Sequence, residues 1–254
     1  MRTIKSLFNS ILRKNNYELK NIKRVAQYIE LEDSDKDLID KILEEDLTMT
    51  SAERLLATFI SVKHVCNLNI QGDIVECGVW RGGNSIVALY ALNKLNNNKA
   101  LWMYDTFKGM TKPSLYDFEN SDGKLAKEEF DKNTDEDHNN WCYASLQDVN
   151  ENIKNYRKGV EVKMIEGDIT ETLKIKSNIP SSISVLRLDT DWYESTKTEL
   201  EILYPKLSTG GVLIIDDYGH WGGCKKAVDE YFSNLEKKPL LIPSDYTGRM
   251  AIKT

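Results

Sequence analysis

The chain has 254 residues, a formal net charge of -6 at pH 7 and hydrophobic residues at 41% of its positions. This length is enough for one substantial core, so we expect a single catalytic α/β domain with an N-terminal extension. The acidic balance and the lack of a long Lys/Arg cluster argue against a nucleic-acid partner, because nucleic-acid-binding surfaces carry a basic stripe.

The four cysteines are scattered and form no Cys-x-x-Cys pair. This pattern is typical of free thiols in a reducing compartment, so we expect a cytoplasmic protein. No apolar run approaches the roughly eighteen residues of a membrane span, so no transmembrane segment is expected. The start, MRTIKSLFNSILRKN, places its apolar residues on one helical face. Packing on its own domain or on a second subunit is favoured for such a helix, and a membrane surface is the alternative.

Residues 1–70 are helix-like and form the predicted N-terminal helical extension. In the segment TSAERLLATFISVKHV the apolar residues recur at helical spacing, and Thr50 and Glu53 match a Thr-x-x-Glu capping box at its start. The extension holds more apolar positions than one flank of a sheet requires. We therefore expect a homo-oligomer, most simply a dimer, built partly from these helices.

Residues 71–254 form the second predicted region, in which short aliphatic runs alternate with longer amphipathic segments. This is the pattern of repeated strand–helix units over a parallel sheet, and it predicts a doubly wound α/β fold. The expected strands are Asp73–Cys77, Ala100–Tyr104, Val160–Ile165, Ile183–Leu188 and Gly211–Ile215, with two late strands near Leu240 and Met250.

One long stretch, residues 106–141, shows no regular pattern and is acidic and polar. It contains Pro113, Gly123 and the run DKNTDEDHNN. Loops of this length in compact domains are usually lids, binding loops or disordered segments. We expect a lid over the ligand.

The segment DIVECGVWRGGNS predicts a strand, a glycine-containing turn and the start of a helix. Glycine permits positive φ and close approach of a ligand, and a helix start offers free N–H groups. The turn lacks both the GxGxxG spacing and a P-loop lysine, which makes a pyrophosphate ligand a poor fit. Glu76 ahead of the turn suits a ligand with an amino group. The predicted cofactor residues here are Glu76, Gly78, Gly82, Gly83, Asn84 and Ser85, although such turns are about as often plain connections.

Acidic residues follow the other predicted strands, and in an open parallel sheet these strand ends meet at the ligand-binding edge. Asp105, followed by Thr106, is the expected ribose ligand. Asp168 can contact an adenine amino group, with Ile169 against the ring, or can cap the next helix, and the two roles are compatible. Asp189 and Asp191 follow the fourth strand, and the adjacent Asp216 and Asp217 follow the fifth. Two adjacent anions at the edge of a core are costly unless a cation or an array of donors compensates them.

The segments MTSAERL, VECGVWRGGNSI, YDTFKGM and LRLDTDWYESTKTEL, together with GGVLIIDDYGHWGG, resemble the macrocin-type sugar O-methyltransferase family in the expected order. The resemblance covers about residues 48–232. It implies a class I methyltransferase fold, Rossmann-like and mostly parallel with a late antiparallel strand. It also implies S-adenosylmethionine as cofactor, a divalent cation such as Mg²⁺, and a sugar or glycan acceptor.

By this resemblance Glu76, Gly78, Asp105 and Asp168 line the cofactor. Asp189, Asp216 and Asp217 are metal ligands, and Asp191 is either a ligand or a base. A hard cation prefers carboxylate oxygens, and it would neutralise the two adjacent aspartates while it activates an acceptor hydroxyl.

His220 is the second candidate base, although a structural or substrate-binding role is favoured for it. The rival functions are a nicotinamide-dependent oxidoreductase, against which the missing GxGxxG turn argues, and a catalytically silent cofactor-binding subunit.

Overall fold

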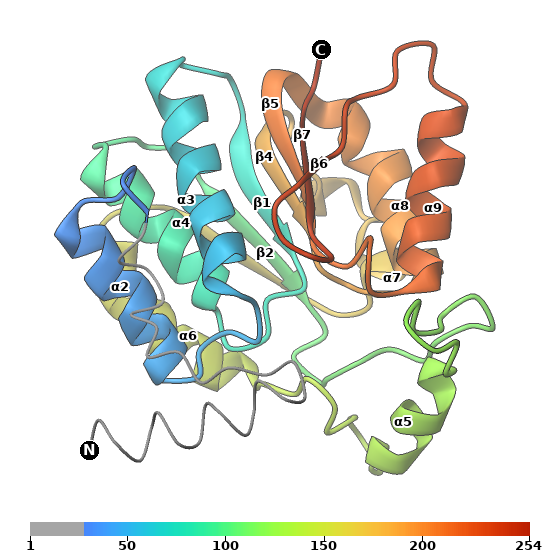
Figure 1. The fold of residues 1–254 in the computed structure, drawn as a ribbon. Coiled ribbons are helices and arrows are strands. Elements are labelled where there is room, and N and C mark those ends of the chain that lie inside the picture. Colours follow the sequence, from blue (N-terminus) through green and yellow to red (C-terminus); the bar gives the residue numbers. More distant parts are fainter. Residues whose placement is uncertain (1–27) are drawn as a thin grey trace, which may run out of the picture.

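The computed structural model describes residues 28–254, and the helix expected in MRTIKSLFNSILRKN lies outside them. A seven-stranded sheet in the described chain stands between two layers of helices (Figure 1). Its strand order is β3-β2-β1-β4-β5-β7-β6. The first five strands of the chain run parallel, and β7 lies antiparallel to both β5 and β6. This is the predicted Rossmann-like, doubly wound fold with a late antiparallel strand.

The strands lie close to their predicted positions. Their bounds are β1 Asp73–Cys77, β2 Leu101–Asp105, β3 Val162–Glu166, β4 Ile183–Leu188, β5 Leu207–Ile215, β6 Ile242–Pro243 and β7 Arg249–Ile252. For β1 and β4 the prediction is confirmed residue by residue. The largest shift is in β5, which begins four residues before the expected Gly211 because Leu207 already pairs with Ile183, ahead of an irregularity in the pairing.

Helices cover both faces of the sheet. One face carries α2 Asp33–Glu44, α3 Ala52–Asn67, α4 Gly83–Lys94 and α6 Leu146–Arg157, and the other carries α7 Ile169–Thr172, α8 Tyr193–Ile202 and α9 Gly222–Ser233 (Figure 1). Two short 3₁₀ turns, Lys176–Asn178 and Tyr204–Lys206, complete the connections. Successive side chains of a strand point to opposite faces of the sheet, and so they enter two different cores. Ile74 belongs to the core under α3 and α4, and its neighbour Val75 belongs to the core under α8 and α9.

Helix α3 is part of the same core as the sheet. Leu55, Phe59 and Val62 are buried against residues of α4 and of the strands. The residue that caps this helix is Ser51, whose Oγ accepts from the N–H of Arg54 at 3.4 Å. The predicted cap at Thr50 is therefore wrong by one residue, because Thr50 Oγ1 instead pairs with Thr48 Oγ1 at 2.9 Å.

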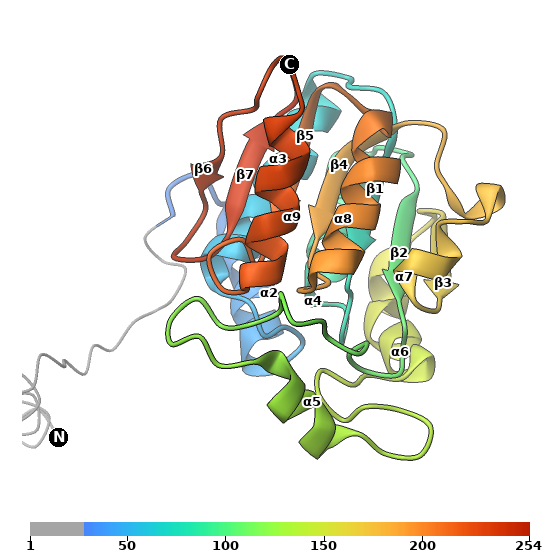
Figure 2. The same ribbon diagram turned by 90° about the vertical axis from the view of Figure 1, so that its right-hand side faces the viewer.

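The predicted lid, residues 106–141, is more regular than expected because it contains helix α5, Ala126–Asn133. The lid crosses the end of the sheet from which α8 and α9 start (Figure 2). It is fastened there by an isolated bridge between Glu119 and Trp221. Within residues 28–254, no helix combines the length and apolar character that crossing a membrane requires.

Candidate active site

A cavity of about 320 Å³ lies at the ends of the parallel strands, within the size range of small-molecule sites. Most of the predicted site residues line it. They are Glu76, Gly78, Asn84, Asp105, Thr106, Asp168, Ile169, Asp189, Asp191, Asp216, Asp217 and His220. The lining does not include Gly82, Gly83 or Ser85, which the sequence also predicted as cofactor residues.

Gly78 directly follows β1 and lies beside the carboxyl end of β4. Its φ is +81°, and a Cβ atom there would lie 2.0 Å from the carbonyl oxygen of Asp189. No other residue fits, because both the backbone conformation and the space require glycine. This glycine brings the first strand's turn against the acidic end of the fourth strand.

The rest of the turn is occupied by contacts within the chain. The N–H of Gly83 donates to the carbonyl of Leu47 at 2.9 Å, so the helix start offers fewer free donors than expected. Ser85 Oγ donates to Glu76 Oε2 and Asn84 Nδ2 donates to Thr50 Oγ1. Gly82 caps α4 with φ +92°. Gly82, Gly83 and Ser85 therefore build the turn, and Ser85 holds the carboxylate of Glu76, which itself lines the cavity.

Asp105 organises this turn directly. Its Oδ2 accepts from the N–H groups of Val79 at 2.7 Å and Trp80 at 3.0 Å, and its Oδ1 accepts from the N–H of Phe107 at 2.8 Å. Burial raises the pKa of this carboxyl, and the three N–H donors oppose the rise. Asp105 also lines the cavity, where the sequence predicted a ribose contact.

Asp168 has the capping role that the sequence left open. Its Oδ1 accepts from the N–H of Thr170 at 2.9 Å at the start of α7. Asp168 and the following Ile169 also line the cavity, so a contact with a ligand is compatible with the cap.

Three carboxylates that line the cavity lie close together. Asp189, Asp191 and Asp217 each offer an oxygen, and these atoms lie within 4.8 Å of one another. Burial and the neighbouring acids raise the pKa values of Asp189 and Asp217 well above the usual range, and burial raises the pKa of Asp191 to about 7. Clustered carboxylate oxygens are the donors that Mg²⁺ and Ca²⁺ prefer, so this donor set fits a hard divalent cation.

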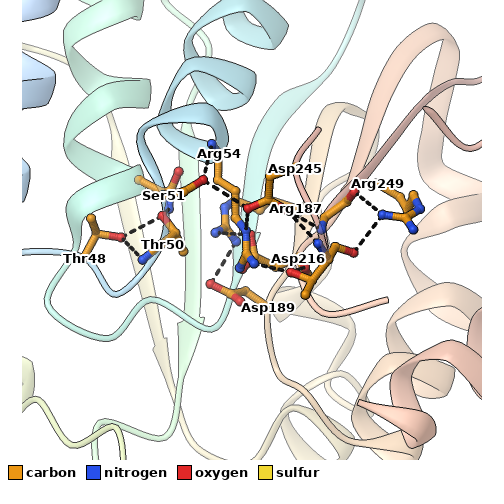
Figure 3. Close-up of polar contacts among 12 residues, drawn as sticks. Thr48, Thr50, Ser51, Arg54, Arg187, Asp189, Asp216, Asp245 and Arg249 are labelled. Carbon is orange, nitrogen blue, oxygen red and sulfur yellow. Dashed lines mark hydrogen bonds and ion pairs between the residues drawn. The ribbon is translucent and has the colours of Figure 1, made fainter. Parts of the chain in front are cut away.

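Asp216 is placed differently from the expected ligand set. Its Oδ2 accepts from Nη1 of Arg54 and its Oδ1 accepts from Nη2 of Arg187 at 2.7 Å (Figure 3). Asp216 is therefore compensated by an array of donors, one of the two solutions expected for adjacent anions. Asp191 takes the place that the sequence gave Asp216 in the close cluster.

Sequence reasoning missed both arginines. Arg187 lies in β4 and its Nη1 is 2.9 Å from Asp189 Oδ2, while its Nε is 3.9 Å from Glu76 Oε1. One buried cation thus pairs with an acid of the predicted cofactor set and with an acid of the carboxylate cluster. The sequence did contain a signal for Arg187, because it is the single charged residue within the run ISVLRL.

The family model for macrocin O-methyltransferase matches residues 4–249. The chain belongs to the macrocin O-methyltransferase family. Demethyldecarbamoylnovobiocin O-methyltransferase of Streptomyces niveus is 34% identical over 204 residues, which are 79% of this chain and 73% of that one. Mycinamicin III 3''-O-methyltransferase of Micromonospora griseorubida is 31% identical over 189 residues, 72% of this chain and 69% of that one. This protein is therefore an O-methyltransferase, and the oxidoreductase alternative is not supported.

Solved structures agree with the fold of this O-methyltransferase. The O-methyltransferase NovP has a TM-score of 0.69 and 32% identity, and the match covers 82% of both chains. The calicheamicin methyltransferase CalS11 has a TM-score of 0.59 at 15% identity, covering 93% of this chain and 99% of that one, which supports the fold alone.

An aromatic cluster closes the lid end of the O-methyltransferase cavity. The rings of Trp141, Trp192 and Trp221 meet edge to face, with centroids 5.0 to 5.9 Å apart. Trp192 Nε1 donates to the carbonyl of Thr111 at 2.9 Å, which ties the lid to the start of α8. His220 lines the cavity beside this cluster, with its ring edge-on to Trp221 at 4.7 Å.

Proposed function

We propose that this O-methyltransferase transfers the methyl group of S-adenosylmethionine to a hydroxyl of a sugar carried by a small molecule. The observation that carries the proposal is one cavity that is lined by both the glycine turn and the carboxylate cluster. The names of the relatives from Streptomyces niveus and Micromonospora griseorubida support a small-molecule acceptor. A further relative, from Streptomyces olivaceus, is named for methylating a rhamnosyl group of a tetracenomycin.

The cofactor part of the cavity would hold S-adenosylmethionine through the residues predicted from the sequence. Glu76 would hold the amino group, Asp105 the ribose hydroxyls, and Asp168 with Ile169 the adenine. Gly78 keeps the wall between cofactor and carboxylates thin, because a side chain there would collide with Asp189. Such placement brings the methyl donor close to the acceptor end, and alignment of the reacting atoms is a large part of methyl-transfer catalysis.

The acceptor half would hold a divalent cation, most simply Mg²⁺, through Asp189, Asp217 and Asp216. Asp189 and Asp217 belong both to the expected ligand set and to the observed cluster. We keep Asp216 as the third ligand because ligating carboxylates commonly accept hydrogen bonds from outer groups, as it does from its arginines. When bound, the cation would stabilise the negative charge that develops on the acceptor oxygen.

Asp191 is the base that we propose for the acceptor hydroxyl. It adopts a left-handed backbone with φ +68°, a conformation that is costly for a non-glycine residue and often occurs at functional sites. Its side chain lines the cavity beside Asp217. His220, which lines the cavity beside Trp221, would contact the acceptor sugar.

The proposal is tested by mixing the purified protein with S-adenosylmethionine, Mg²⁺ and unmethylated glycosides of the kinds named for its relatives. Mass spectrometry should find S-adenosylhomocysteine and a singly methylated sugar. Calorimetry should detect binding of S-adenosylmethionine and none of NAD. Methylation of the aglycone in place of the sugar would overturn the acceptor assignment.

We further propose that the enzyme works in the cytoplasm as a homodimer. Its four cysteines are free, which fits a reducing compartment. The dimer proposal rests on the apolar N-terminal extension, and light scattering that gives the monomer mass at micromolar concentration would contradict it.

A further inference from the structure

Arg54 lies in the first turn of α3, within the segment MTSAERL. Its guanidinium is buried at the acceptor end of the cavity, and each of its three nitrogens has a separate partner. Nη1 donates to Asp216 Oδ2, Nε donates to Asp245 Oδ2 at 2.7 Å, and Nη2 donates to Thr247 Oγ1 (Figure 3). One side chain of the N-terminal region thus joins the exit of β5 to the turn between β6 and β7.

The turn that Arg54 holds is itself well fixed. Asp245 Oδ1 accepts from the N–H groups of Thr247 at 3.0 Å and Gly248 at 2.7 Å, while Ser51 Oγ donates to Asp245 Oδ2 at 3.0 Å. The Thr247 hydroxyl in turn donates to the backbone carbonyl of Asp216 at 3.2 Å. Residue 216 is therefore held twice, by its side chain through Arg54 and by its carbonyl through Thr247.

This double attachment also fixes the next residue, Asp217, because fixing the carbonyl of residue 216 orients the peptide bond that joins the two. Asp217 is a member of the close carboxylate cluster. The orientation of the cluster thus depends on Arg54, whether or not Asp216 itself coordinates a cation.

We propose that Arg54 is a positioning residue that holds the Asp216–Asp217 pair in the geometry that binds the divalent cation. The inference rests on the proposed function, since the cation is part of it. It assigns a role to the N-terminal region: α3 completes the acceptor end of the active site, which the methyltransferase sheet alone does not build.

Arginine is specifically required for this role. A planar guanidinium serves three acceptors in fixed directions, whereas a lysine ammonium is a single point on a flexible chain. Arg54→Lys therefore keeps the positive charge beside Asp216 and removes the three donors in fixed directions. A change in cation affinity in this variant reports positioning, because the net charge near the site is the same.

The test is calorimetric titration of Mg²⁺ into the full-length protein saturated with S-adenosylhomocysteine, with S-adenosylhomocysteine affinity measured separately. Arg54→Lys should bind Mg²⁺ about 10-fold more weakly or worse, the usual loss when an outer partner of a metal site is removed. Its affinity for S-adenosylhomocysteine should stay within about twofold, since Arg54 makes no contact with the cofactor residues. The matched control is Arg249→Lys, because Arg249 holds the same turn through the carbonyls of Thr247 and Gly248 and should leave Mg²⁺ affinity unchanged.

If the wild type binds Mg²⁺ and Arg54→Lys binds it equally well, the inference is overturned and the proposed function is not. A wild-type protein that binds no divalent cation would overturn the cation of the proposed function and the inference with it. If Arg54→Lys loses S-adenosylhomocysteine binding as well, the variant Thr247→Val tests the inference in its place. It keeps the side-chain shape and removes the hydroxyl that links Arg54 to the carbonyl of Asp216, so Mg²⁺ affinity should fall while S-adenosylhomocysteine binding remains, and no fall would overturn the inference.

Discussion

The Nη2 atom of Arg187 lies 2.7 Å from the Oδ1 atom of Asp216, and both side chains are only 2% exposed. This ion pair is therefore shielded from solvent in the middle of the active site. Removing one partner of such a pair leaves an uncompensated buried charge, which is far more costly than the net worth of the pair.

Arg187→Met should accordingly destabilise the protein by about 3–5 kcal/mol in urea unfolding. The double variant Arg187→Met/Asp216→Asn should cost less than the sum of the two single variants, because the second change removes one of the charges left unpaired. The two costs would simply add if Arg187 served only to fill space in the sheet.

Chelation should separate chemistry from cofactor binding. Turnover should be lost in EDTA and return with Mg²⁺, while S-adenosylmethionine still binds, because the proposed cofactor contacts run through Glu76, Asp105 and Asp168. Elemental analysis measures the bound metal, and calorimetry in the same buffer measures the binding of S-adenosylmethionine. Full turnover in EDTA with no bound metal would remove the cation and leave Asp191 as a simple base.

Asp191 and Asp216 should differ in what their loss affects. Asp216→Asn should weaken Mg²⁺ binding by about 10-fold or more, since losing even an outer partner of a metal site costs that much. Asp191→Asn should keep Mg²⁺ affinity within a few-fold and lower kcat by about 10²–10⁴, the usual contribution of a general base. The reverse pattern would make Asp191 the third ligand, as its place in the observed cluster allows.

Cofactor binding should depend on pH through Glu76. Burial raises the pKa of this carboxyl to about 7, although the nearby Arg187 and the Ser85 hydroxyl oppose the rise. Only the ionised form holds an ammonium strongly, so S-adenosylhomocysteine affinity should rise between about pH 6 and pH 7.5. Glu76→Gln should bind more weakly by about 10-fold and lose this rise, because a charge-assisted hydrogen bond is gone. If the affinity of both proteins has the same pH dependence, a group other than Glu76 causes it.

The sequence predicts the strands of the sheet well because each aliphatic run is bounded by turn residues. β1 and β4 are correct at both ends for this reason. The convergence of Asp105, Asp189 and Asp217 on one edge also follows from sequence, because the carboxyl ends of parallel strands meet there.

Contacts between distant segments could not be predicted in this way. Arg54 meets Asp216 across 162 positions of the chain, and no periodicity encodes that distance. The same holds for Gly83, whose N–H is taken by Leu47 instead of a ligand. The helix in the lid was missed because its short segment AKEEFDKN buries only Ala126 and so shows no strong apolar stripe.

Glu199 provides a prediction about stability that is separate from the active-site acids. It lies in α8, fully buried, and its Oε1 accepts from Thr190 Oγ1 at 2.8 Å, while its Oε2 has no hydrogen-bond partner among residues 28–254. Burial raises the pKa of this carboxyl from 4.5 to about 8, against the opposing effect of the Thr190 hydroxyl. The folded protein therefore keeps a proton on Glu199 at pH values where the unfolded chain has lost it.

The sign of the pH dependence follows from this difference. Between about pH 4.5 and pH 8 the folded state binds more protons at this position, so Glu199 makes the protein less stable as pH rises through that window. Glu199→Gln keeps the acceptor for Thr190 and removes the titration. From pH 5 to pH 8 the free energy of unfolding of the variant should gain about 3 kcal/mol relative to the wild type. Urea unfolding at several pH values measures this gain, and a constant difference between the two proteins would mean that Glu199 is ionised in the folded state.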